Sequence, residues 1–129
     1  MISVEKESMS MTVVAYIDNL FFSAKVSEVA RRIGVPLVLT STPEAAEEKA
    51  RLEPPALLIA DLNAAGDVPA LAARLKNDPA TKQIRLIGFY SHVQHELMER
   101  AKAAGFDLLL PRSAFVTRLA ELLGEKSPF

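Results

Sequence analysis

Four polar side chains follow apolar stretches of the sequence, each at the point where the stretch ends. Asp18 follows "MTVVAYI", Asp61 follows "LLIA", Ser91 follows "IRLIGFY" and Arg112 follows "FDLLLP". Because the carboxyl ends of parallel strands face the ligand crevice, we expect these four side chains to converge in space, although they are distant in the sequence. Asp61 could then be a working carboxylate at the mouth of the sheet.

The same residues also have purely structural interpretations. Asp61 could be a polar residue at a strand end that pairs with Arg112, and we expect this two-pronged ion pair in the unmodified protein. Ser91 could cap the helix that follows it, because Gln94 stands three residues later, at the spacing of a capping box. The sequence leaves the functional and the structural interpretation open.

Five strand-like runs alternate with five helical patterns, which is typical of repeated βαβ units. Gly34 is expected to end the first helix, and Thr42 is expected to cap the second, with Pro43 in its first turn. The last two helices are expected at about His92–Ala104 and Ala114–Leu123. The predicted strands cover residues 11–17, 35–40, 56–60, 84–90 and 106–110. The pattern predicts an α/β protein with three layers, α/β/α, and a doubly wound five-stranded parallel sheet whose ligand crevice lies at the carboxyl ends of the strands.

Composition and charge fit one globular domain. The chain has 129 residues, of which 50% are hydrophobic and 24% charged, and its net charge is −1. This charge gives no electrostatic footprint for nucleic acid or an anionic membrane, so neither is expected as a partner. The lack of cysteine excludes disulfides and zinc–thiolate sites. We expect a cytoplasmic protein with a flexible leader at residues 1–10, a single domain at 11–125 and a tail at 126–129.

The order and spacing of these positions resemble the receiver domain of response regulators, the CheY-like superfamily. The motif "LLIADLN" is similar to the segment that carries the family's phosphoacceptor, and it places Asp61 there. Ser91 lies 30 residues later (91 − 61), where the family has Ser or Thr, and "AKAAGFDLLLPR" resembles the segment with the family's lysine. The resemblance covers about residues 11–123 and implies a flavodoxin-like strand order of 2-1-3-4-5. It also implies a Mg²⁺ site formed by Asp18, Asp61 and the backbone carbonyl of Asn63.

The chain departs from the family's pattern at the residues that would bind the metal and the phosphoryl group. Receivers carry two acids after the first strand, whereas this chain has Asp18 with Asn19 beside it. Which of the two faces the crevice stays open, and in one register Ile17 replaces the first acid. Arg112 replaces the lysine and differs from it in size and geometry. Leu109 replaces the family's aromatic switch residue.

These departures predict an atypical, degenerate receiver. We expect a stand-alone bacterial pseudo-receiver that acts by protein–protein contact in a phosphorelay-type pathway and is not an enzyme. One alternative is a genuine phosphoacceptor that catalyses its own phosphorylation on Asp61 with Mg²⁺ and the hydrolysis of that phosphate. The other is a flavodoxin-like protein that binds a small ligand in the crevice. Mg²⁺ is expected to bind weakly because one carboxylate is missing.

Protein contacts are expected on two surfaces. The partner would be a histidine kinase or another signalling protein. Phe22 is expected in the core, whereas Phe21 is expected to be exposed and to mark a contact surface. A homodimer is expected through the fourth helix, fifth strand and fifth helix, where Arg118 and Glu121 would point outward on a self-complementary face.

Overall fold

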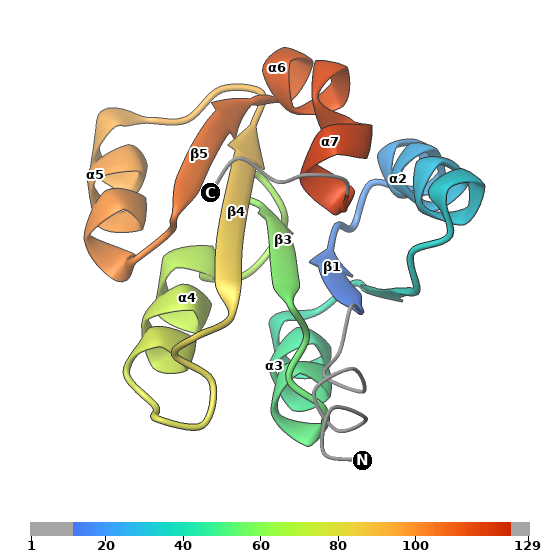
Figure 1. The fold of residues 1–129 in the computed structure, drawn as a ribbon. Coiled ribbons are helices and arrows are strands. Elements are labelled where there is room, and N and C mark those ends of the chain that lie inside the picture. Colours follow the sequence, from blue (N-terminus) through green and yellow to red (C-terminus); the bar gives the residue numbers. More distant parts are fainter. Residues whose placement is uncertain (1–11, 125–129) are drawn as a thin grey trace.

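The computed structural model describes residues 12–124 and has the predicted α/β architecture (Figure 1). Five parallel strands form one sheet in the order β2-β1-β3-β4-β5, which confirms the predicted fold class. The strands are β1 (Val13–Tyr16), β2 (Leu37–Thr40), β3 (Leu57–Asp61), β4 (Arg85–Tyr90) and β5 (Leu108–Pro111). The helices are α2 (Leu20–Ile33), α3 (Pro43–Leu52), α4 (Val68–Lys76), α5 (His95–Ala104), α6 (Arg112–Thr117) and α7 (Leu119–Leu123). The predicted leader at residues 1–10 and tail at residues 126–129 lie outside the described residues.

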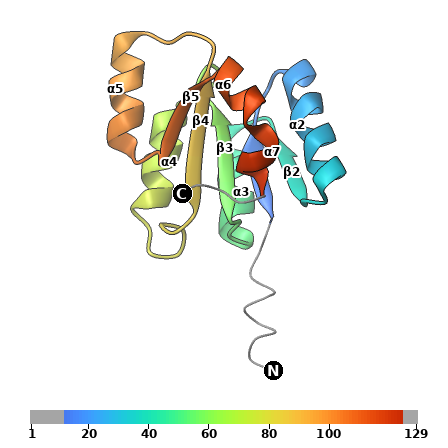
Figure 2. The same cartoon turned by 45° about the horizontal axis from the view of Figure 1, so that its top comes forward.

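Helices cover both faces of the sheet, and each face has its own hydrophobic core (Figure 2). One face carries α2, α6 and α7, and the other carries α3, α4 and α5. Successive side chains of a strand point to opposite faces. Val13 and Ala15 of β1 therefore enter the core under α2 and α7, whereas Val14 and Tyr16 enter the core under α3 and α4. Burial on both faces explains why the central strands read as continuous apolar runs.

Two local signals in the sequence place helix ends correctly. The Thr42 side chain accepts a hydrogen bond from the Ala45 N–H at 3.1 Å and caps α3, with Pro43 as its first residue. Gly34 ends α2 with a φ of +80°, a left-handed conformation that glycine adopts without a steric cost. Both predictions are confirmed, because α2 ends and α3 begins where the sequence places these helix ends.

The two C-terminal helices differ from the prediction. The helix after β4 begins at His95 and not at His92. The residues before it form a loop that the Asn63 side chain holds through hydrogen bonds. The expected helix 114–123 is two short helices, α6 and α7, with a break at Arg118. The break keeps the expected inner side, since Phe115 and Leu119 are still fully buried.

Candidate functional site

The carboxyl ends of four strands meet at one edge of the sheet and bring the predicted polar residues together. β1 pairs with β3, β3 with β4, and β4 with β5, so the loops that follow these strands are neighbours. Asp18 and Arg112 are both near enough to Asp61 for their charges to change its pKa. Asp18, Asp61 and Arg112 therefore lie together at this edge of the sheet, called the crevice below because the ligand crevice of a parallel α/β sheet lies there.

Asp61 is the last residue of β3 and is only 2% exposed. Its Oδ1 accepts a hydrogen bond from the Asn63 N–H at 2.8 Å. Burial raises the pKa of Asp61 and the Asp18 carboxylate adds to the rise, while the Asn63 N–H and the Arg112 charge oppose it. A nucleophile has to come within about 3–3.5 Å of the atom it attacks. Because Asp61 is almost fully buried in this structure, the residues that cover its carboxylate would have to move before a donor could come that close.

The end of β1 holds the loop between β3 and α4 through both backbone polar groups of Ala65. The Tyr16 hydroxyl donates a hydrogen bond to the Ala65 carbonyl, and Asp18 Oδ2 accepts one from the Ala65 N–H at 3.0 Å. Burial, and after it the Asp18 charge, raises the pKa of the Tyr16 phenol. The next residue, Gly66, has a φ of +100°, and a Cβ there would lie 2.9 Å from the Tyr16 hydroxyl. The loop therefore needs glycine at this position to approach Tyr16 so closely.

Asp18, and not Asn19, faces the crevice. Asn19 is the N-cap residue of α2, where its side chain accepts a hydrogen bond from the Phe22 N–H at 2.9 Å. Ile17 is 3% exposed and lies in the core under α2. An aspartate at position 19 would therefore keep the helix cap without adding a carboxylate to the crevice.

The Asn63 side chain joins the loop after β3 to the loop after β4. Its Oδ1 accepts hydrogen bonds from the Ser91 N–H at 2.8 Å and from the Ser91 hydroxyl at 3.2 Å, and its Nδ2 donates to the His92 carbonyl at 2.7 Å. The predicted capping role of Ser91 is wrong, because α5 begins at His95 with Gln94 as its N-cap residue. The hydroxyl that could meet a phosphoryl oxygen is bound to Asn63 instead.

Arg112 stacks on an aromatic ring and does not pair with Asp61. Its guanidinium carbon lies 5.1 Å from the centroid of the Phe22 ring, a cation–π distance. Within residues 12–124 its buried Nε makes no hydrogen bond, and no ion pair joins it to Asp61. The predicted ion pair is therefore wrong. The cause is a ring cluster beside the crevice, in which Phe22 lies 4.8 Å from Phe89 and 6.0 Å from Phe115 between ring centroids.

The side chains at the crevice fit a divalent cation poorly. Across residues 12–124, no group of three or more His, Cys, Asp or Glu side chains could hold a metal ion. Asp18 and Asp61 are the two acids of the crevice, and each already accepts a backbone N–H. Mg²⁺ requires a nearly ideal octahedron of oxygen ligands.

Reasoning from the sequence misses Tyr16 and the side-chain role of Asn63. Tyr16 lies in a predicted apolar strand, although a buried tyrosine usually needs a partner for its hydroxyl. The resemblance implies a backbone carbonyl role for Asn63, whereas its side chain makes the contacts between the loops. The polar tip of Tyr16 was a signal for the first residue, and the sequence carried no comparable signal for the second.

The fold is that of the receiver domains of response regulators. The chemotaxis protein CheY4 of Vibrio cholerae is 18% identical, with a TM-score of 0.76 over 90% of this chain and 97% of that one. A signal receiver domain of a DNA-binding response regulator from Colwellia psychrerythraea is 16% identical, with a TM-score of 0.73 over 88% and 98%. The Mn²⁺-bound form of response regulator Rcp1 is 17% identical, with a TM-score of 0.72 over 86% and 90%. No protein-family model and no curated protein matches the sequence.

Proposed function

We propose that the chain is a receiver-type signalling domain that works as a pseudo-receiver, through protein–protein contact and without phosphorylation of Asp61. One observation supports this proposal above the others: the polar groups that phosphoryl transfer would use are occupied by the protein itself. Asp18 accepts a backbone N–H of the loop after β3, Ser91 binds Asn63, and Arg112 lies on a ring. Each hydrogen bond that a ligand displaced would cost about 0.5–1.5 kcal/mol.

The receiver fold also suggests the setting in which such a domain works. We place it in a phosphorelay-type pathway, with a histidine kinase or another signalling protein as its partner, because the solved structures of similar fold are response regulators and their receiver domains. Turnover of a substrate is not part of the proposal. In the part of the chain that the structure describes, no helix is long and apolar enough to cross a membrane. The cytoplasmic location and the bacterial origin stay predictions from the sequence.

A genuine phosphoacceptor is the second candidate, and the position of Asp61 favours it. Asp61 ends β3 beside the Asp18 carboxylate, and one protein of similar fold, Rcp1, was solved with Mn²⁺. In this case an Asp61 oxygen would form a bond to the phosphorus of a donor while the donor's own bond to phosphorus breaks; with acetyl phosphate the P–O bond breaks and acetate leaves. Arg112 would have to leave the Phe22 ring to meet the new negative charge. Mg²⁺ binding would be weak under either candidate, because Asp18 and Asp61 are the two carboxylates that residues 12–124 bring together at the crevice.

Incubation with acetyl phosphate and Mg²⁺, followed by intact-mass spectrometry, tests the choice between the two. We expect no phosphoryl adduct on the wild-type protein. An adduct that is present on the wild type and on Asp67→Asn, but absent from Asp61→Asn, would overturn the proposal. Asp67 suits this comparison because its carboxylate serves as the N-cap of α4 and makes none of the hydrogen bonds described above for Asp18, Asp61 and Ser91.

A further inference from the structure

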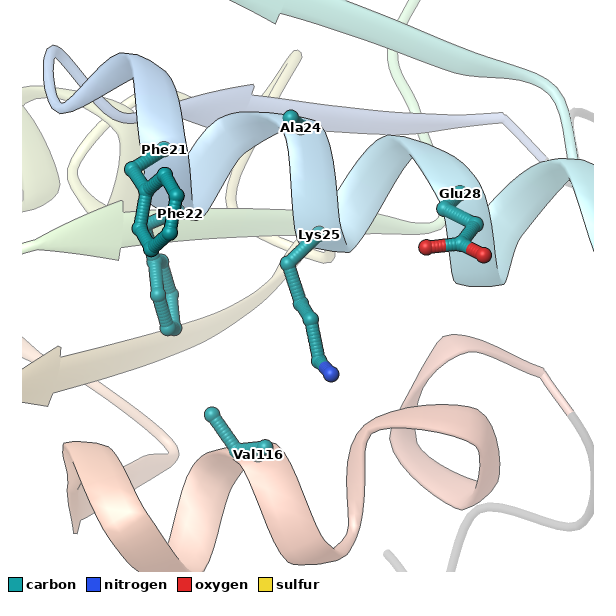
Figure 3. A pocket seen from close by; sticks show the side chains of 6 residues that line it. All are labelled: Phe21, Phe22, Ala24, Lys25, Glu28 and Val116. Carbon is teal, nitrogen blue, oxygen red and sulfur yellow. The ribbon is translucent and has the colours of Figure 1, made fainter.

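A groove of about 450 Å³ lies between α2 and α6 (Figure 3). Phe22 and Lys25 extend from α2 toward α6, and Val116 extends from α6 toward α2. The lining residues are mostly apolar, with one cation and one anion among them: Phe21, Phe22, Ala24, Lys25, Glu28 and Val116. The groove therefore offers an apolar hollow with a charge of each sign beside it.

An apolar projection stands next to this hollow. Leu20 is 84% exposed and Phe21 is 88% exposed, and both are at the start of α2. Two other large apolar side chains of residues 12–124 are exposed, Leu39 at 43% and Leu52 at 73%, and neither lines the groove. Exposed apolar side chains that lie together are typical of a contact surface. The prediction that Phe21 is exposed is confirmed.

The charges beside the groove have no partner within the described residues. Lys25 and Glu28 are three residues apart on α2, a spacing that allows an ion pair. Across residues 12–124 neither of them forms one. On the face that the sequence predicted for a dimer the charges do pair within the chain, Arg118 with Glu121 at 3.4 Å and Lys102 with Glu99 at 3.8 Å. Charges available for an intermolecular contact therefore lie on α2.

We propose that a second copy of this chain occupies the groove, in a two-fold dimer whose α2 helices pack antiparallel. A two-fold contact has to be complementary to itself, and this face supplies a projection, a hollow, a cation and an anion. If the axis passes midway between Lys25 and Glu28, Lys25 of each copy meets Glu28 of the other. Phe21 lies four residues before Lys25 and Arg32 lies four after Glu28, so each Phe21 packs against Arg32 of the other copy. Phe21 also covers one end of the opposite groove.

Sedimentation velocity over a concentration series tests this dimer, together with four variants of α2. We expect a wild-type dimer that dissociates at low concentration. Phe21→Asp should abolish it, with at least about a hundredfold weaker association, because each copy loses its apolar projection. Lys25→Glu and Glu28→Lys should each weaken it by about tenfold. Each substitution removes both Lys25–Glu28 ion pairs of the symmetric dimer, and a single exposed ion pair contributes modestly. The double variant with both reversals should restore it, because the opposite charges meet again.

Two controls separate this interface from its rivals. Leu52→Asp removes another exposed apolar side chain and should leave the dimer intact, and thermal melts should show Phe21→Asp folded. A monomer at several hundred micromolar wild-type protein would overturn the proposal, and so would a dimer that survives Phe21→Asp. The proposal would also be overturned if the double variant dimerised as weakly as either single charge reversal. Loss of the dimer in Arg118→Glu, with Phe21→Asp unaffected, would assign the contact to the α7 face instead.

Discussion

Replacement of Asn63 by alanine removes three hydrogen bonds that join the loops after β3 and β4. Two of them come from Ser91, at 2.8 Å and 3.2 Å, and the third goes to the His92 carbonyl at 2.7 Å. A hydrogen bond in a protein contributes about 0.5–1.5 kcal/mol. These groups are exposed, so water replaces part of each bond and the lower end of that range applies. We expect Asn63→Ala to lower the free energy of unfolding by about 1.5 kcal/mol, or the melting temperature by about 5 °C.

Urea unfolding measures this loss, and amide hydrogen exchange locates it. The Ser91 amide should exchange faster in Asn63→Ala, because its N–H loses its acceptor. Ser91→Ala is the matched control, since it removes only the 3.2 Å bond from the hydroxyl and should cost about 0.5 kcal/mol or less. If Asn63→Ala unfolds at the wild-type urea concentration and the Ser91 amide stays protected, the side chain does not join the two loops.

Substitutions at four further positions test the crevice and the cap of α4. Tyr16→Phe removes the hydroxyl bound to the Ala65 carbonyl and should lower the free energy of unfolding by about 1–2 kcal/mol in urea unfolding. Burial raises the pKa of Asp61, so the folded state holds a proton that the unfolded state releases, and wild-type stability should fall as the pH rises from 3.8 through the raised pKa. Asp61→Asn should therefore be more stable than the wild type at pH 7, with a difference that disappears below pH 3.8. Arg112→Met should raise the pKa of Asp61 further, measured by an NMR titration of its carboxyl carbon, because the guanidinium charge lowers that pKa. Asp67→Ala should lower the free energy of unfolding by about 1 kcal/mol at pH 7, because α4 loses its N-cap side chain. Asp67→Asn should keep most of the stability that the cap contributes.

The fold follows from the sequence wherever the signal is local or periodic. Thr42 and Gly34 mark helix ends because a side-chain cap and a left-handed residue act within a few positions of the chain. Alternation of strands and helices gives the layers, since a parallel strand needs a crossover helix. The predicted start of α5 is wrong because the true start depends on Asn63. The Asn63 side chain holds Ser91, which lies 28 residues later in the sequence. A capping-box spacing at Ser91 carries no information about that competing contact.

The site was predictable in its location and not in its contacts. The carboxyl ends of parallel strands bring Asp18, Asp61 and Arg112 together whatever their partners are. Each partner is chosen by packing between distant segments. The Tyr16 hydroxyl reaches a carbonyl 49 residues away, and Arg112 finds the Phe22 ring. The Asp61–Arg112 ion pair was predicted from opposite charge alone. In the structure Arg112 packs on the Phe22 ring instead.

Binding of beryllofluoride with Mg²⁺, a mimic of the aspartyl phosphate, tests whether Asp61 can act as a phosphoacceptor. Amide spectra of labelled protein should be recorded as both reagents are added, with Asp61→Asn as the matched control. We expect the Ser91 and Ala65 amide signals of the wild-type protein to stay at their reagent-free positions at millimolar reagent, because Asn63 and Asp18 already hold these amides. A saturable shift of these amide signals in the wild type, absent from Asp61→Asn, would contradict the proposed pseudo-receiver function and identify Asp61 as a working phosphoacceptor.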